Sequence, residues 1–156
     1  MKKFLLIVIT SSYLTYGEGT KNPLDNIQIT AESMQYDPSN KQAFANNNVK
    51  LIYMVNNLPV TLTSDNMRAY FDDSGKMLKV IAEGNVLVTY NDSNLYAQTC
   101  THDFNKEQTT CTGPDVKIIK GKDEMHGTIA TLDINTQVFT MHAEGQNQVT
   151  GIIYPT

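Results

Sequence analysis

Residues 29–51 read ITAESMQYDPSNKQAFANNNVKL, and this stretch, with three related copies downstream, decides the fold. The copies are aligned by four small residues: Ala31, Ser64, Ala97 and Gly127. Their offsets are 33, 33 and 30 residues (64−31, 97−64 and 127−97). A period of 20–50 residues indicates that each copy is one supersecondary unit, which buries its apolar face only by packing on its neighbours.

Each copy has the pattern of a β-hairpin strand that changes face. Residues 27–31 alternate apolar and polar, so one side of this half-strand is buried. The next apolar residues, Met34 and Tyr36, lie three and five positions after Ala31, where the alternation has reversed. A strand cannot change faces without an extra residue. We therefore predict a bulge near the third position after the small residue, at which the strand leaves one sheet and enters a facing one.

Turn signals follow each half-strand at a regular distance. Four segments fit short hairpin loops: 37–40, 72–75, 103–106 and 133–136. Each begins with Asp, whose side chain can cap the turn, and Asn or Gly tolerates positive φ. A second kink is expected at Gly84 and its counterparts. Beyond residues 1–17 no segment has a helical apolar stripe, so the sequence predicts an all-β protein of antiparallel strands, built as a sandwich, barrel or jelly roll.

The composition argues against several classes of function. The formal net charge is −4 and the pI is about 5.2, and no basic stripe is present, which disfavours a nucleic-acid partner. The three histidines, His102, His126 and His142, fall in different copies and are interpreted as structural or surface residues. The sequence contains no nucleophile elbow, metalloprotease motif or phosphate-binding glycine loop. We therefore predict no catalytic residues, no metal site, no cofactor and no enzymatic activity.

The N-terminus has the pattern of a secretory signal peptide. Two lysines precede the apolar segment Phe4–Ile9, and a polar-to-small tail follows. We predict a signal peptide over residues 1–17, cleaved after Gly17 or Gly19, and one domain over residues 18–156. An uncleaved anchor remains an alternative, although the apolar run is shorter than the roughly 20 residues of a membrane-spanning helix. Removing the two lysines changes the formal charge from −4 to −6, so the mature chain is acidic and exported.

The two cysteines of the chain, Cys100 and Cys111, lie on the two arms of the third hairpin. Pairing about the turn at residues 103–106 places them opposite each other, within disulfide reach. In an oxidising compartment an even number of cysteines indicates a disulfide. The alternative is that both are small core residues, like their counterparts Met34 and Ala45 in the first copy.

A set of apolar residues recurs at equivalent places in the copies and is expected to line one side of the rolled sheet. Its members are Ile27, Ile29, Leu62, Val86, Val88, Leu95 and Met125. They could pack against one another as an ordinary core. They could also line an apolar groove for long acyl chains, if the sheet does not close completely. Sequence spacing does not decide between these alternatives.

Residues 29–51, and the second copy with Leu62-Thr63-Ser64-Asp65 followed by residues 80–86, resemble the OstA-like repeat of lipopolysaccharide-export proteins. The resemblance covers residues 25–153 and is greatest for small periplasmic members. It implies a twisted β-jellyroll, open along one side, that binds lipopolysaccharide and shields the acyl chains of lipid A between the two membranes. The chain departs from the family pattern at Pro114, which interrupts the usual Gly-Asn-Val.

The resemblance also implies partners. These are an LptC-like inner-membrane protein, an LptD-like outer-membrane protein and further copies in a head-to-tail homo-oligomer, joined through terminal strand edges. Two other functions remain open: an LptC-like, membrane-anchored export component, and a structural module that only self-associates.

Overall fold

The computed structural model describes residues 27–155, and these form strands and turns without a helix. The strands are β1 (Gln28–Thr30), β2 (Ser33–Asp37), β3 (Gln42–Val55), β4 (Leu58–Phe71), β5 (Met77–Tyr90), β6 (Ser93–Asp103), β7 (Gln108–Lys120), β8 (Asp123–Asp133), β9 (Val138–His142) and β10 (Thr150–Ile152). The predicted signal peptide lies outside the described residues, within which no helix is long and apolar enough to cross a membrane.

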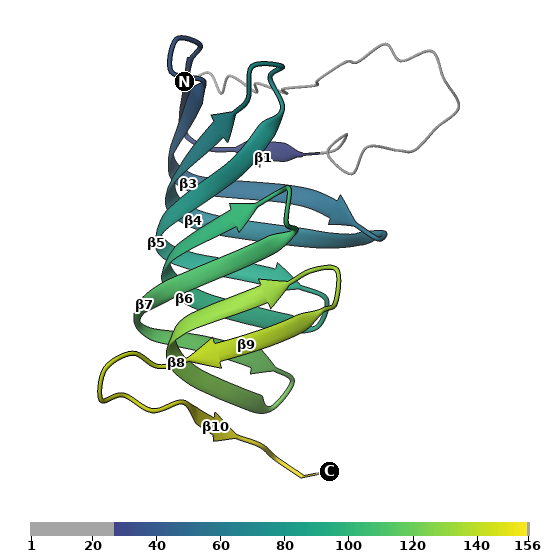
Figure 1. Ribbon diagram of the computed structural model, residues 1–156, viewed down its shortest axis with the longest axis vertical. Coiled ribbons are helices and arrows are strands. Elements are labelled where there is room, and N and C mark those ends of the chain that lie inside the picture. The colour runs from purple at the N-terminus through teal and green to yellow at the C-terminus, as the bar shows by residue number, and fades with distance from the viewer. Residues whose placement is uncertain (1–26, 156) are drawn as a thin grey trace.

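All ten strands belong to one antiparallel sheet, which the chain builds in sequence order. The order is β1-β3-β4-β5-β6-β7-β8-β10, with β2 also paired to β3 and β9 to β8. Figure 1 shows the strands stacked along the long axis, with the N-terminal strands at one end and β10 at the other. Two short strands therefore share each edge of the sheet: β1 and β2 at one edge, β9 and β10 at the other.

The long strands β3–β8 bend near their middle, which folds the sheet into two facing walls (Figure 1). The register shifts at the bend in every pair from β3·β4 to β7·β8. We call this line the crease. The first wall comprises residues 27–31, 49–64, 86–97, 116–127 and 150–152, and the second wall comprises residues 33–46, 66–83, 99–112 and 128–142. Each long strand thus contributes one half to each wall.

The predicted bulges exist, but they lie closer to the small residue than expected. On β4 the pairing with β5 is interrupted after Thr63, so the bulge is at Ser64 and Asp65 rather than three positions beyond Ser64. The reason lies in the neighbouring strand, where Gly84 and Asn85 both have positive φ (81° and 47°). The amide of Asn85 donates a 3.0 Å hydrogen bond to the Asp65 carboxylate, which fixes the two bulges side by side.

The Asp-initiated turns form as predicted. The carboxylate of Asp37 accepts hydrogen bonds from the backbone N–H groups of Ser39 (3.0 Å) and Asn40 (3.2 Å). Asp72, Asp103 and Asp133 cap the equivalent turns in the same way. These turns all lie at the free end of the second wall. The free end of the first wall carries shorter turns, in which residues such as Asn56 and Asn57 have positive φ.

The crease gives a first testable prediction, for which the chain supplies a matched pair of glycines. Gly84 and Gly75 have nearly equal φ (81° and 83°), but a Cβ on Gly84 would collide with the Asp65 side chain, whereas Gly75 faces open space. Gly84→Ala is expected to lower the free energy of unfolding by about 2 kcal/mol, and Gly75→Ala by about 1 kcal/mol. Chemical denaturation of both variants checks this, and equal losses would mean that contact with Asp65 is unimportant.

Candidate functional site

The register aligns one row of apolar side chains, all but one of them branched, across the inner face of the first wall. The row consists of Ile29, Leu51, Leu62, Val88, Leu95, Ile118 and Met125, each the direct partner of the next. Direct partners in antiparallel strands point to the same face. With strands about 4.8 Å apart, the row runs for roughly 29 Å from β1, at one edge of the sheet, to β8, beside the edge strand β10.

Five of the seven apolar residues selected from the sequence belong to this row. The other two lie beside it: Val86 is paired with Ala97 in the next row, and Ile27 precedes β1 and packs against the core. Sequence reasoning missed Leu51 and Ile118, although the Val-Lys-Leu and Val-Lys-Ile alternations that contain them were visible. The structure therefore brings the selected residues together on one wall.

The interior is filled rather than open along its length. Leu62, Val88 and Leu95 are at most 1% exposed, whereas Ile29 and Met125, at the two ends of the row, are partly exposed. The buried apolar residues of both walls form one continuous cluster. The packed-core alternative thus describes the middle of the molecule, and the apolar interior reaches the surface at its ends.

The facing row, on the second wall, has a different composition. It consists of Met34, Ala45, Met67, Ala82, Cys100, Cys111, Ala130 and Met141. Methionine is unbranched and adapts to irregular space, and the other members are small. The two facing rows therefore differ: the row on the first wall is mostly branched, and the row on the second wall consists of small or adaptable side chains.

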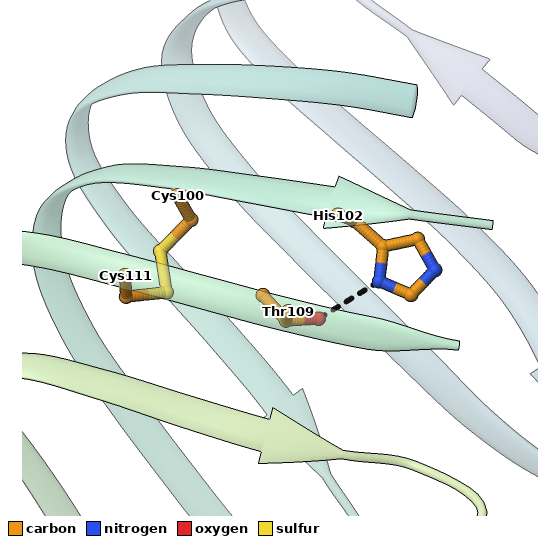
Figure 2. Close-up of a disulfide and its surroundings, with 4 residues drawn as sticks. All are labelled: Cys100, His102, Thr109 and Cys111. Atoms are coloured by element: carbon orange, nitrogen blue, oxygen red, sulfur yellow. Dashed lines mark hydrogen bonds between the residues drawn. A yellow bond between two sulfur atoms is a disulfide. The ribbon is translucent and has the colours of Figure 1, made fainter. Parts of the chain in front are cut away.

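Cys100 and Cys111 are joined by a disulfide in the middle of this row (Figure 2). They are direct register partners, with a Cα–Cα distance of 4.1 Å, and both are fully buried. The bond therefore crosses one pair of adjacent strands, β6 and β7, and its sulfur atoms form part of the inner surface of the second wall.

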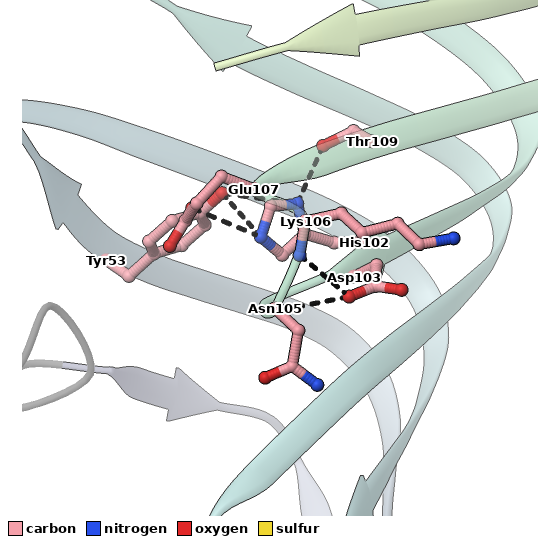
Figure 3. Close-up of polar contacts among 7 residues, drawn as sticks. All are labelled: Tyr53, His102, Asp103, Asn105, Lys106, Glu107 and Thr109. Atoms are coloured by element: carbon pink, nitrogen blue, oxygen red, sulfur yellow. Dashed lines mark hydrogen bonds and ion pairs between the residues drawn. The ribbon is translucent and has the colours of Figure 1, made fainter. Parts of the chain in front are cut away.

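A polar cluster interrupts the apolar interior at the free ends of the walls (Figure 3). The Tyr53 hydroxyl, on the first wall, lies 2.8 Å from Nε2 of His102, on the second wall. The Nδ1 atom of His102 lies 2.8 Å from the hydroxyl of its register partner Thr109. A neutral imidazole has one donor and one acceptor nitrogen, so either tautomer satisfies both contacts, with the hydroxyls in complementary roles.

Two further polar atoms near this cluster have no hydrogen-bond partner among the described residues: the Tyr90 hydroxyl and Oε2 of Glu107. The Glu107 oxygen lies 4.0 Å from Nε2 of His102. Burial raises the pKa of the Glu107 carboxyl, and burial, reinforced by Glu107, raises the pKa of Tyr53. The cluster thus favours uncharged groups, as expected in an apolar interior.

The histidine in this cluster makes stability depend on pH. Burial lowers the pKa of His102 to about 4, an effect that nearby Asp103 partly opposes, whereas an unfolded histidine titrates near 6.5. Between these values the unfolded chain binds the extra proton, so stability is full above about pH 6.5 and falls as the pH decreases towards 4. We expect the free energy of unfolding of wild type to fall by about 2 kcal/mol between pH 7 and pH 5 because of His102. The His102→Gln variant should not show this loss.

Urea denaturation of both proteins at these two pH values measures that difference. The raised pKa of Glu107 has the opposite effect on stability: near pH 4.5 and above, it makes the free energy of unfolding decrease as the pH rises. This effect is common to both proteins. An equal pH dependence in wild type and variant would contradict the assignment to His102.

The other two histidines lie apart from this cluster. His126 is partly exposed between Asp115 (3.1 Å) and Glu124 (3.2 Å), whose hydrogen bonds raise its pKa, and His142 is exposed on β9. Within residues 27–155, no group of three or more His, Cys, Asp or Glu side chains is placed to hold a metal ion. The feature shared by all six long strands is the apolar interior, which is therefore the candidate functional site.

Comparison with known proteins identifies the fold and the family. A search of curated proteins finds no match to this sequence. Among solved structures, the chain is similar to the crystal structure of LptH, the LptA-homologous periplasmic component of the lipopolysaccharide transport device of Pseudomonas aeruginosa. The TM-score is 0.71 at 15% identity, over 83% of this chain and 96% of LptH. The predicted all-β jellyroll is thereby confirmed.

The family model for the LptA and LptD N-terminal domain, described as a lipopolysaccharide transport protein, matches residues 28–138. These residues run from β1 to the start of β9 and include six of the seven apolar residues selected from the sequence. The resemblance to OstA-like export proteins, and to LptA in particular, is confirmed. The chain belongs to the LptA/LptD N-terminal domain family of lipopolysaccharide transport proteins.

Proposed function

We propose that this protein acts in the periplasm as a lipopolysaccharide-binding bridge between the inner and outer membranes, with lipid A acyl chains held between its two walls. The observation that carries the proposal is the apolar row that crosses seven neighbouring strands from Ile29 on β1 to Met125 on β8. An acyl chain gains roughly 0.8 kcal/mol for each methylene removed from water. A continuous apolar interior supplies this gain along its length without favouring one position.

The composition of the walls supports movement of the ligand along this interior. The methionines of the second wall can change rotamer to make room, and the adjacent Ala side chains leave space for them. The β-branched members of the row on the first wall, Ile29, Val88 and Ile118, are stiffer. An acyl chain held between one adaptable and one stiff surface can occupy successive positions along the interior with similar energies.

The ends of the sheet support the proposed partners. Each edge consists of two short strands with unpaired backbone groups, a template for strand addition. We propose that an LptC-like inner-membrane protein and an LptD-like outer-membrane protein add to these edges, and that copies of this chain stack head to tail. Exposed Val149, Ile152 and Ile153 at the C-terminal edge provide apolar surface for such contacts.

Site-specific photo-crosslinking in cells tests the lipid ligand. A photoreactive amino acid at Ile29 or Met125 is expected to capture lipopolysaccharide, because both side chains reach the interior and lie at its accessible ends. The matched controls are Gln28 and Glu124, their neighbours on the opposite face of the same strands. Capture at the control positions that equals capture at Ile29 and Met125 would contradict the proposal.

The crosslinking experiment and an intact-mass measurement together separate the alternative functions. A structural module that only self-associates would yield protein–protein adducts without lipid. An LptC-like anchored component would retain residues 1–17, which an intact-mass measurement of the protein from the envelope detects. Loss of 17 or 19 residues would agree with cleavage after Gly17 or Gly19 and with a periplasmic location.

A further inference from the structure

The two walls are joined in different ways at their two margins. At the crease, the backbone of six strands passes from one wall to the other, so the walls cannot separate there. At the opposite margin, which we call the mouth, the walls meet only through side chains. Opening of the interior from the side can therefore occur only at the mouth.

Tyr53 and His102 join the walls at this mouth (Figure 3). Tyr53 lies two residues before the end of β3, and His102 one residue before the end of β6, so both are remote from the crease. They come from strands that are not neighbours in the sheet. No other pair of side chains from β3–β8 makes a hydrogen bond across the interior between the two walls.

An aromatic contact surrounds this hydrogen bond. The Phe104 ring packs edge-on against both partners, with centroids 5.4 Å from Tyr53 and 4.5 Å from His102. The three rings are buried at this point of the mouth, where Tyr53 and His102 are each 1% exposed. The contact is polar at its centre, unlike the aliphatic packing deeper inside.

A polar contact of this kind can open at modest cost. When the walls separate, the Tyr53 hydroxyl and His102 Nε2 can each bond to water, so breaking the hydrogen bond itself costs only its net value. Exposure of the three buried rings adds the cost of hydrating their apolar surface. The other nitrogen of His102 stays bonded to Thr109, which lies on the same wall. The imidazole therefore keeps its orientation and can pair again with Tyr53 when the mouth closes.

We propose that Tyr53 and His102 form a clasp that closes the mouth of the folded sheet, and that acyl chains enter the filled interior from the side when this clasp opens. The proposed opening rests on the contacts at the mouth, whereas the identity of the entering ligand rests on the proposed lipopolysaccharide-binding function.

Chemical modification of His102 measures the opening without any ligand. Diethyl pyrocarbonate reacts with accessible imidazoles, and His102 is buried, so its reaction requires an open mouth. Tyr53→Phe removes the hydroxyl and keeps the ring, and is expected to increase the rate at His102 about fivefold, the equivalent of one net hydrogen bond. Peptide mass spectrometry reports the rates at His126 and His142 in the same sample, and these should not change.

Tyr90→Phe is the matched control, because Tyr90 is also buried at the mouth of the first wall but its hydroxyl has no partner among the described residues. It should leave the His102 rate unchanged. An unchanged rate in Tyr53→Phe, or an equal increase in both variants, would overturn the clasp. Thermal melts of the two variants identify any general loss of stability.

Uptake of fluorescently labelled lipopolysaccharide, followed by stopped-flow fluorescence, tests the route of entry. Tyr53→Phe should load about fivefold faster than wild type, and Tyr90→Phe at the wild-type rate. Faster modification of His102 without faster loading would overturn entry through the mouth. If wild type fails to bind lipopolysaccharide at all, the proposed function and the acyl-chain part of this inference fail, while the modification rates still decide whether the clasp exists.

Discussion

Replacing Cys100 and Cys111 together by Ala is expected to lower the free energy of unfolding by about 3 kcal/mol, because the variant loses the disulfide. The bond closes a loop with a sequence separation of 11 residues. In its absence the unfolded chain gains conformational freedom, and two buried positions of the second wall lose their sulfur atoms. For a domain of this size the melting temperature should fall by roughly 10 °C.

The control for this variant is the neighbouring register pair, Thr101 and Thr110, which is also directly cross-strand but only partly buried. Replacing both threonines by Ala should cost less than about 1 kcal/mol. Calorimetry of the two double variants makes the comparison, and wild type under reducing conditions should behave like the cysteine variant. Equal melting temperatures for all of these proteins would show that the disulfide does not stabilise the sheet.

Leu62→Ala is expected to cost about 3 kcal/mol in the lipid-free protein. Leu62 is fully buried at the centre of the row on the first wall, between its partners Leu51 and Val88. Truncation removes apolar contacts and leaves a cavity, because strands fixed on both sides cannot close around it. Urea denaturation measures the loss.

Thr61→Ala serves as the comparison, since Thr61 is adjacent to Leu62 and lies on the outer face of β4. This substitution should lower the free energy of unfolding by about 0.5 kcal/mol or less. A similar small loss for Leu62→Ala would mean that the interior is loosely packed in the absence of lipid, contrary to the burial observed. It would also remove the need for the walls to separate when an acyl chain enters.

The fold could be predicted from the sequence because its signals are local and repeated. The alternation around Ala31, the Asp residue at each turn and the small residues at equal spacing each depend on only a few neighbouring positions. The position of the bulge could not be obtained in this way. It is set by contact between Asp65 and the opposite strand at Gly84 and Asn85, which a single-strand pattern does not contain.

The candidate site was predicted in part for the same reason. The residues of the first wall, such as Leu62 and Val88, follow the two-residue period of a strand and were selected. The clasp was not, because Tyr53 and His102 lie 49 residues apart on strands that do not pair. Their contact depends on the angle at which the sheet folds, and the sequence alone indicates for His102 only a structural or surface role.

Since each long strand spans both walls, the width and the length of this molecule are determined by different properties of the sequence. Strand length, 14 residues in β3, β4 and β5, sets the cross-section, whereas the number of strands sets the distance from one edge to the other. Duplication of a single hairpin would therefore lengthen the interior by two strand spacings, about 10 Å, without altering its cross-section. Proteins of this architecture can thus change the distance they span by gaining or losing repeats, with little adjustment of the residues that line the path.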